Sequence, residues 1–332
     1  MVAARPRCVP SWHDEDSGPR RPGGLRHGTD RPRRCPVSAR LREVARDNER
    51  ILAAGGYEAA GRWVPLGEAA ARAADGTRMH GPGPVEGAGG APAGGPRDTP
   101  AEVTAETSLA AARRLAGEGA DRVGVLNFSS ARNPGGGYVN GARAQEEELC
   151  RASALYPALL RAPEFYAAHR ADRSPFYTHR VIHSPAVPVF RDDAGALLPE
   201  PYAVDFLTSP APNAGVIAQR TPEETDRIPA ALAGRAERVL EVAAVAGVTA
   251  LVLGAWGCGV FRNDPAQVAA AFRTHLEPGG RFAGRFPRLV FAVWDRQPRS
   301  ANRAARSGST AISATGSPSS PCRTPSGSPA RW

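Results

Sequence analysis

The sequence predicts an α/β domain in which helices cover both faces of a sheet of buried strands. Two short apolar runs, Val123–Phe128 and Ala250–Leu253, are typical of strands that are covered on both sides. Further strands are expected at 180–183, 204–208 and 289–294. Between these runs apolar residues recur at helical spacing, and this alternation indicates a layered α/β architecture.

Helices are predicted over residues 41–54, 109–115, 145–160, 222–247 and 264–276. Two of them have recognisable starts. Thr107 or Ser108 can accept hydrogen bonds from the first turn of one helix, and Asp264, followed by a proline, can cap another. The first helix is expected to end at Gly55–Gly56. A Gly/Pro-rich stretch at 81–99 predicts a loop.

Positive charge is concentrated at the two ends of the chain. The formal net charge of the 332 residues is +9. Residues 1–40 hold nine Arg against four acids, and residues 296–332 hold six Arg and no acid, which leaves −2 for residues 41–295. A mildly acidic middle argues against a nucleic-acid groove, so contact with nucleic acid is expected through the ends only.

The same ends are rich in Arg, Pro, Gly or Ser and lack hydrophobic periodicity. Such segments bury too little apolar surface to offset the entropy of ordering them. We therefore expect disordered tails at 1–39 and 297–332 around one folded domain at 40–296.

The spacing of the cysteines and the hydropathy of the chain narrow the possible classes of protein further. The five cysteines occur without a CxxC pair or a Cys/His cluster, so neither a metal site nor a disulfide framework is expected. No secretory leader and no apolar run of membrane length occurs in the sequence. The expected location is therefore the reducing cytoplasm, with no membrane partner.

The most informative stretch is 127–137, which ends in three consecutive glycines after a predicted strand and a proline. Backbone N–H groups in such a loop suit phosphate oxygens, although many glycine-rich loops are simply flexible. Seven residues later, Gln145–Glu148 opens a predicted helix with three acids, which also complement a helix dipole. Adjacent helical side chains point about 100° apart, so Glu146 and Glu147 are expected to differ in role.

A second glycine-rich stretch, 254–264, follows the strand at 250–253. Loops at the carboxyl ends of strands are where open α/β sheets bind ligands, so two such loops indicate an extended, phosphate-bearing ligand. Neither loop matches the P-loop pattern or the dinucleotide fingerprint. ATP hydrolysis and hydride transfer are therefore disfavoured, and no cofactor is expected.

GGG, seven residues and then QEE together resemble the motif of poly(ADP-ribose) glycohydrolases. Five segments are similar to the bacterial-type branch of that family, in order, over about residues 41–295: LNFSSARNPGGG, ARAQEEELCRASALY, HSPAVPVFRDD, FLTSPAPNAG and LGAWGCGVFRNDP. The resemblance implies a macrodomain-like, three-layer α/β/α fold with a mixed central sheet. It also implies a catalytic domain that hydrolyses the 1″–2′ ribose–ribose bond of terminal ADP-ribose units.

The resemblance further assigns roles to residues of this chain. Glu147 would be the catalytic acid, Glu146 would hold ribose hydroxyls, Gln145 would help to fix the first loop, and Asn133 would contact the distal ribose. The residues implied to cradle the diphosphate are Gly135, Gly136 and Gly137 with Gly257, Cys258, Gly259, Val260 and Phe261, of which Phe261 would also pack against the distal ribose. Glu106 and Thr107 are the candidates for adenine contacts.

The implied chemistry agrees with a single acidic residue. An oxocarbenium-like transition state needs a proton for the departing oxygen and then an activated water, and one glutamate can supply both in turn. The implied substrate is poly(ADP-ribose) or ADP-ribosylated protein, and the product is ADP-ribose. Two alternatives keep the same cleft: a macrodomain that binds ADP-ribose without cleaving it, and a hydrolase of protein-linked mono-ADP-ribose esters.

Overall fold

The computed structural model describes residues 37–89 and 101–294. The first helix begins at Val37, just inside the predicted tail at 1–39. The rest of that tail, the tail at 297–332 and residues 90–99 of the predicted loop lie outside the described residues.

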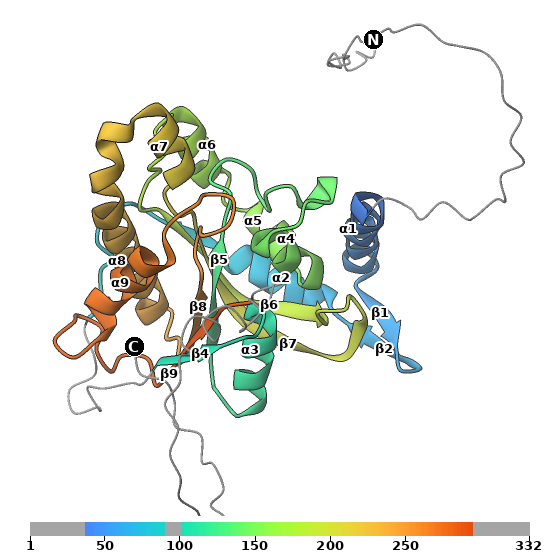
Figure 1. Cartoon of the computed structure of the whole chain (residues 1–332). Coiled ribbons are helices and arrows are strands. Elements are labelled where there is room, and N and C mark those ends of the chain that lie inside the picture. Colours follow the sequence, from blue (N-terminus) through green and yellow to red (C-terminus); the bar gives the residue numbers. More distant parts are fainter. Residues whose placement is uncertain (1–36, 90–100, 295–332) are drawn as a thin grey trace, which may run out of the picture. The chain divides into compact units, whose positions relative to one another are not determined.

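Within the described residues the chain forms nine α-helices, two 3-10 helices and nine strands (Figure 1). In chain order they are α1 (Val37–Ala54), β1 (Gly56–Ala59), β2 (Arg62–Pro65), α2 (Gly67–Gly76), β3 (Arg78–His80), β4 (Ala101–Thr104), α3 (Ser108–Gly117), β5 (Val123–Phe128), η1 (Tyr138–Asn140), α4 (Gln145–Ala152), α5 (Leu155–Leu159), α6 (Pro163–Ala171), β6 (Val181–Arg191), β7 (Leu197–Ser209), α7 (Ala214–Arg220), η2 (Pro222–Arg227), α8 (Ile228–Val245), β8 (Ala250–Gly254), α9 (Pro265–Leu276) and β9 (Arg288–Ala292).

Seven of the strands form one mixed sheet in the order β3-β6-β7-β5-β8-β9-β4. The central strand β5 pairs in parallel with β7 and β8, and β9 lies parallel to both β8 and β4. β6 runs antiparallel to β3 and β7, while β1 and β2 form a separate antiparallel pair. The predicted mixed sheet is therefore confirmed.

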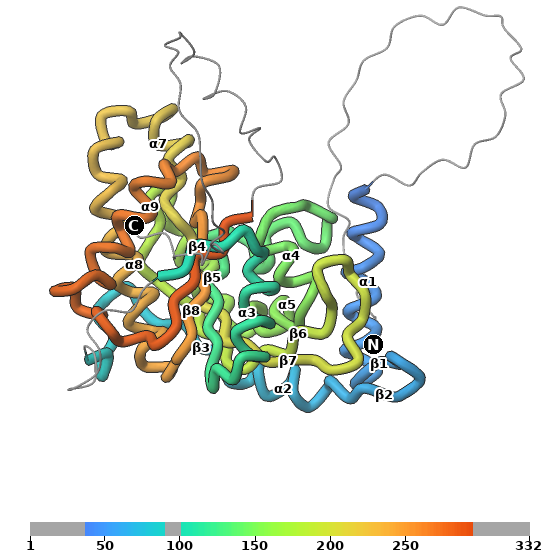
Figure 2. The backbone as a smooth tube through the Cα atoms, turned by 60° about the horizontal axis from the view of Figure 1, so that its bottom comes forward, coloured from blue at the N-terminus to red at the C-terminus, as the bar shows by residue number. Residues whose placement is uncertain are grey.

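Helices cover both faces of this sheet. In β8, Ala250 and Val252 pack into a hydrophobic cluster with α1 to α6, whereas Leu251 and Leu253 pack into a second cluster with α7 to α9. Successive side chains of a strand point to opposite faces, which is why neighbours in the sequence belong to different clusters. Figures 1 and 2 show α7, α8 and α9 on one side of the sheet and α1 to α5 on the other.

The continuous helix predicted at 145–160 is wrong. Ser153 separates α4 from α5 with extended backbone angles (φ −143°, ψ 174°), and it forms a bridge to Val189 in β6. The Ser153 hydroxyl donates a hydrogen bond to the carbonyl of Leu149 (2.7 Å) and so ends α4. Pro157 has no N–H to donate inside a long helix, but it is tolerated in the first turn of α5.

Three other predicted elements have different boundaries. The first six residues of the helix predicted at 222–247 form η2, and the strand predicted at 289–294 ends at Ala292. The strands predicted at 180–183 and 204–208 extend to 11 and 13 residues, because β6 and β7 pair with each other beyond their apolar segments.

Both predicted helix caps are confirmed. The Thr107 hydroxyl accepts a hydrogen bond from the N–H of Ala110 (3.0 Å) at the start of α3. The Asp264 carboxylate accepts one from the N–H of Ala266 (2.9 Å) at the start of α9. α3 and α9 therefore begin where predicted, immediately after segments that line the cleft described next.

Candidate active site

A cleft with a volume of about 720 Å³ opens at the carboxyl ends of the parallel strands β5, β8 and β9. The first loop (residues 129–137) follows β5, and the second loop (residues 255–263) follows β8. Both contribute to the cleft, together with the start of α4. Of the residues predicted from the sequence, the cleft is lined by Glu106, Thr107, Asn133, Gln145, Glu146, Glu147, Gly257, Cys258, Gly259, Val260 and Phe261.

The three glycines of the first loop do not line the cleft, and their N–H groups face protein acceptors. Gly136 donates to the carbonyl of Asn133 (3.0 Å) and Gly137 donates to Oε1 of Glu147 (2.8 Å), while the Gly135 N–H favours the ionised form of the nearby Glu146 carboxyl and so opposes the rise of its pKa. Two of the three N–H groups are therefore directed at the glutamates, and that of Gly136 closes the loop on Asn133. The diphosphate cradle that the resemblance implied for these glycines stays a prediction.

Glu147 is held at the first turn of α4 by two backbone donors. Its Oε2 accepts a hydrogen bond from the N–H of Ala144 (2.9 Å), and its Oε1 accepts the one from Gly137. The residue is buried, with 7% of its surface exposed, yet it lines the cleft. A carboxyl group fixed in this way has one orientation toward a ligand, which is what a general acid requires.

Glu146 lies deeper and bonds to a different set of groups. Its Oε2 accepts the N–H of Ser130 (2.6 Å), and its Oε1 accepts the side-chain amide of Asn127 (3.4 Å). Burial raises the pKa of Glu146 to about 8, and the neighbouring Glu147 carboxyl adds to that rise. At neutral pH this side chain is therefore mostly a neutral carboxyl group. The two glutamates have different surroundings, and their different roles stay a prediction.

The raised pKa of Glu146 predicts a pH dependence of stability. The folded protein holds a proton on this carboxyl that the unfolded chain releases near pH 4.5. Stability is therefore lost as pH rises from about 4.5 to about 8, by an amount on the order of a few kcal/mol. Glu146→Gln cannot ionise, so its melting temperature should exceed that of the wild type by more at pH 8 than at pH 5. Equal differences at both pH values would contradict this prediction.

Gln145 joins the start of α4 to the end of β5. Its Oε1 accepts the N–H of Phe128 (2.8 Å), and its Nε2 donates to the carbonyl of Leu126 (2.8 Å) and to the hydroxyl of Ser108 (3.1 Å). The side-chain amide thus pairs with the strand backbone as another strand would. This places the two glutamates that follow at the carboxyl end of the central strand.

The second loop differs from the first in its backbone N–H groups. Among the described residues, no acceptor bonds the N–H groups of Gly257, Gly259, Val260 or Phe261. Asn263 stabilises this loop, because its side-chain amide donates hydrogen bonds to the carbonyls of Pro212 (2.8 Å) and Gly257 (3.2 Å). Free donors on a braced loop suit an anionic ligand.

Both the backbone and the thiol of Cys258 bond within this loop, since its N–H donates to the carbonyl of Ala255 (3.2 Å) and its Sγ to that of Trp256 (3.8 Å). Burial raises the pKa of the thiol to about 11, so the sulfur is not a thiolate at neutral pH.

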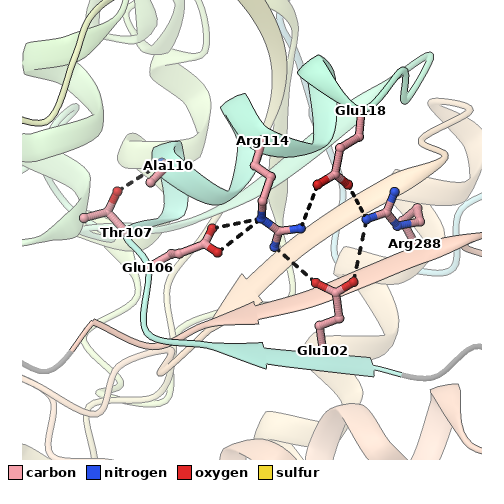
Figure 3. A network of polar contacts seen from close by, with 7 residues as sticks. All are labelled: Glu102, Glu106, Thr107, Ala110, Arg114, Glu118 and Arg288. Atoms are coloured by element: carbon pink, nitrogen blue, oxygen red, sulfur yellow. Dashed lines mark hydrogen bonds and ion pairs between the residues drawn. The ribbon is translucent and has the colours of Figure 1, made fainter. Parts of the chain in front are cut away.

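Glu106 and Thr107 line the cleft, and Figure 3 shows Glu106 as part of a network of ion pairs with Arg114, Glu102, Glu118 and Arg288. Arg114 donates from Nε to both oxygens of Glu106 (3.1 and 3.4 Å) and from Nη2 to Glu102 (3.1 Å). The Thr107 hydroxyl donates to Asp193 (2.8 Å) and also accepts from Ala110. The Thr107 hydroxyl has therefore used its single donor and one of its two acceptor positions, and the Glu106 carboxylate also keeps accepting capacity.

Several cleft residues were not predicted from the sequence. Tyr177, from the segment after α6, and Trp294, after β9, both line the cleft. The side chain of Tyr177 lies beside Phe261, with ring centroids 5.9 Å apart. No pattern in the sequence marks either residue, because each reaches the cleft only through the packing of distant segments.

Residues 37–89 and 101–294 offer neither a metal site nor a membrane-spanning helix. No group of three or more His, Cys, Asp or Glu side chains there is arranged to hold a metal ion. None of the helices in those ranges is long and apolar enough to cross a membrane.

Comparisons with known proteins decide the family. The family model of the microbial-type PARG catalytic domain matches residues 45–192. The poly(ADP-ribose) glycohydrolase of Thermomonospora curvata, solved with the inhibitor ADP-HPD, is 52% identical over 79% of this chain and 96% of its own, with a TM-score of 0.71. This chain belongs to the poly(ADP-ribose) glycohydrolases. The Deinococcus radiodurans member, solved with ADP-ribose, is 48% identical over 71% of this glycohydrolase and 94% of its own chain, with a TM-score of 0.63.

No match was found among the curated proteins. The family and enzyme class that the motifs predicted are nevertheless confirmed, and so is the macrodomain-like fold of this glycohydrolase.

Proposed function

We propose that this glycohydrolase releases ADP-ribose from the terminal unit of poly(ADP-ribose), with Glu147 as general acid and base. One observation carries the proposal. A carboxyl group fixed by two backbone N–H groups lies in the wall of a cleft that also presents unbonded N–H groups from the second loop. An acid and an anion-binding loop in one cleft suit a sugar linked to a diphosphate.

The reaction needs two proton transfers at one carboxyl group. Protonated Glu147 gives its proton to the departing 2′ oxygen as the bond from that oxygen to C1″ breaks. A water molecule then adds to C1″ of the oxocarbenium-like species and gives its proton to Glu147, which restores the acid. Glu146, as a neutral carboxyl group, can both donate and accept hydrogen bonds with ribose hydroxyls.

The terminal ADP-ribose unit is proposed to lie along the length of the cleft. The diphosphate lies against the N–H groups of Gly257, Gly259, Val260 and Phe261, and the distal ribose lies between Asn133, the ring of Phe261 and Glu147. The glycine triplet acts through the glutamates toward which the N–H groups of Gly135 and Gly137 are directed, so its contribution is to position the acid.

Adenine is proposed to lie at the Glu106 end, where Arg114 fixes the carboxylate (Figure 3). Arg114→Gln should raise KM for the polymer about 5-fold with little change in kcat, because about 1 kcal/mol of oriented contact is lost. Arg288→Gln is the matched control, since Arg288 pairs with Glu118 and Glu102 in the same network without touching Glu106. Equal KM values for the two variants, measured by steady-state kinetics, would contradict this role.

Product analysis tests the function against its alternatives. The wild-type protein is incubated with purified poly(ADP-ribose) and, separately, with a protein that carries single ester-linked ADP-ribose units. Release of ADP-ribose from the polymer while the single units remain supports the proposal. Release from the single units but not from the polymer would make the protein an ester hydrolase. Binding of ADP-ribose without any release would make it a reader of the modification.

The remaining expectations concern location and partners. We propose that the enzyme acts in the cytoplasm, because Cys150 and Cys258 both carry free thiols, as is usual in a reducing compartment. Its partners are the polymer or ADP-ribosylated proteins, without a membrane. Contact with nucleic acid would be confined to the Arg-rich ends. A salt titration of DNA affinity for the full chain and for residues 37–294 checks that last point.

A further inference from the structure

Tyr177, which the motifs did not single out, has a backbone conformation that costs free energy. Its φ angle is +58°, in the left-handed region that a bulky residue rarely adopts. Only three other non-glycine residues in the described chain have a positive φ: Ala60, Ala186 and Arg262. Backbone strain of this kind clusters at active sites and ligand-binding sites, where the surrounding structure holds it in place.

Three consecutive residues of this turn are held by hydrogen bonds. The Tyr177 N–H donates to the carbonyl of Ser174 (3.3 Å), and the Thr178 N–H donates to Nε2 of the buried His169 (3.2 Å). Burial lowers the pKa of His169 to about 4, so the ring is neutral at physiological pH and Nε2 remains an acceptor. Its other nitrogen, Nδ1, then donates to the carbonyl of Phe165 (2.9 Å).

The third bond comes from Arg235, a wholly buried guanidinium. It donates to the carbonyl of Phe176 (2.6 Å) and to that of Pro210 (2.7 Å). Its hydrogen-bond partners among the described residues are both carbonyl oxygens rather than carboxylates, and burial lowers its pKa to about 9. Burying an unpaired charge is unfavourable, so its retention needs a reason. Here it ties the Tyr177 turn to residues 210–213, whose carbonyl at Pro212 braces the second loop.

The phenol ring therefore has a fixed place on the cleft wall. It lies 5.9 Å from the ring of Phe261, and no described residue bonds its hydroxyl. We infer that Tyr177 is a substrate-binding residue, which forms an aromatic wall with Phe261 against the ribose beside the scissile bond and donates its hydroxyl to a phosphate oxygen of the terminal ADP-ribose unit. Arg235 is a positioning residue that acts through this turn. The inference rests on the proposed function.

Tyr177→Gly separates binding from folding, because glycine adopts a φ of +58° without strain. We expect its Kd for ADP-ribose, by calorimetry, and its KM for the polymer to rise at least about 10-fold, while the melting temperature changes little. Tyr177→Phe keeps the ring and should raise both values only about 3-fold. Ala60→Gly is the matched control, since it relieves a positive φ (50°) in the turn between β1 and β2 and should leave Kd and KM unchanged.

Arg235→Met tests the positioning role in a double-mutant cycle. Alone it should raise KM, and in the Tyr177→Gly background it should add little, because both changes remove the same wall. Additive effects would show that Arg235 does not act through Tyr177. Wild-type affinity and KM in Tyr177→Gly would overturn the inference even if Arg235→Met does not fold. A wild-type protein that releases no ADP-ribose from the polymer would instead refute the proposed function.

Discussion

Glu147→Gln is expected to slow ADP-ribose release from poly(ADP-ribose) by about 10²- to 10⁴-fold, the usual contribution of a general acid. Glutamine is nearly isosteric, and its oxygen can still accept the N–H of Gly137, although its amide cannot accept the N–H of Ala144. Binding of ADP-ribose should therefore persist with a melting temperature only slightly lowered. Steady-state release assays and calorimetry on the same preparation measure both properties.

Glu148→Gln is the matched control for this prediction. Glu148 is the next acid of α4 and also lines the cleft, but the glycine triplet holds Glu146 and Glu147 instead. Its change should have a far smaller effect on turnover. A larger loss in Glu148→Gln than in Glu147→Gln would move the acid by one residue and refute the assignment.

Gly136→Ala is expected to lower kcat about 10²-fold, because misplacing a catalytic group by about 1 Å has effects of that size. A Cβ atom at this position would lie 2.5 Å from Oε1 of Glu147 and 3.1 Å from Oε2 of Glu146. The carboxyl groups would have to move from the backbone donors that fix them. The φ angle of +58° adds a backbone cost of about 1 kcal/mol for alanine.

Gly61→Ala is the matched control, because it introduces backbone strain at a positive φ without displacing a neighbouring side chain. Its φ angle is +73°, but nothing lies within 4 Å of an added Cβ atom. This variant should lose similar stability and keep full activity. If Gly136→Ala retained wild-type kcat, or if Gly61→Ala lost as much activity, the glycine triplet would not serve to position the glutamates.

Much of this molecule can be inferred from residue types and spacing. Helix caps such as Thr107 and Asp264 act on their own first turn, so local sequence suffices to locate them. Apolar runs such as Val123–Phe128 likewise predict buried strands from local sequence alone. The break in the helix predicted at 145–160 was missed because Ser153 is extended by pairing with Val189, 36 residues later in the chain.

The motif of the glycine triplet and QEE, together with the five similar segments around it, was enough to predict the family, and with it the likeness to solved glycohydrolases. Motifs carry this information because their residues are close in sequence and act on one ligand. What the triplet does in the folded chain was a different matter. Only the packed structure shows that the N–H groups of Gly135 and Gly137 are directed at Glu146 and Glu147, while no described residue accepts a hydrogen bond from the N–H groups of Gly257 and Gly259.

Burial and long-range contacts account for everything else that the tertiary structure alone decided. The raised pKa of Glu146 depends on how completely α4 and the first loop exclude water from one carboxyl group. The place of Tyr177 depends on hydrogen bonds of its two neighbours. Thr178 donates its N–H to His169, and the carbonyl of Phe176 accepts from Arg235, which lies 58 residues away from Tyr177 along the chain. Local patterns in the sequence specify local structure and the order of the motifs along the chain. The desolvation and orientation of side chains arise only when distant segments pack together.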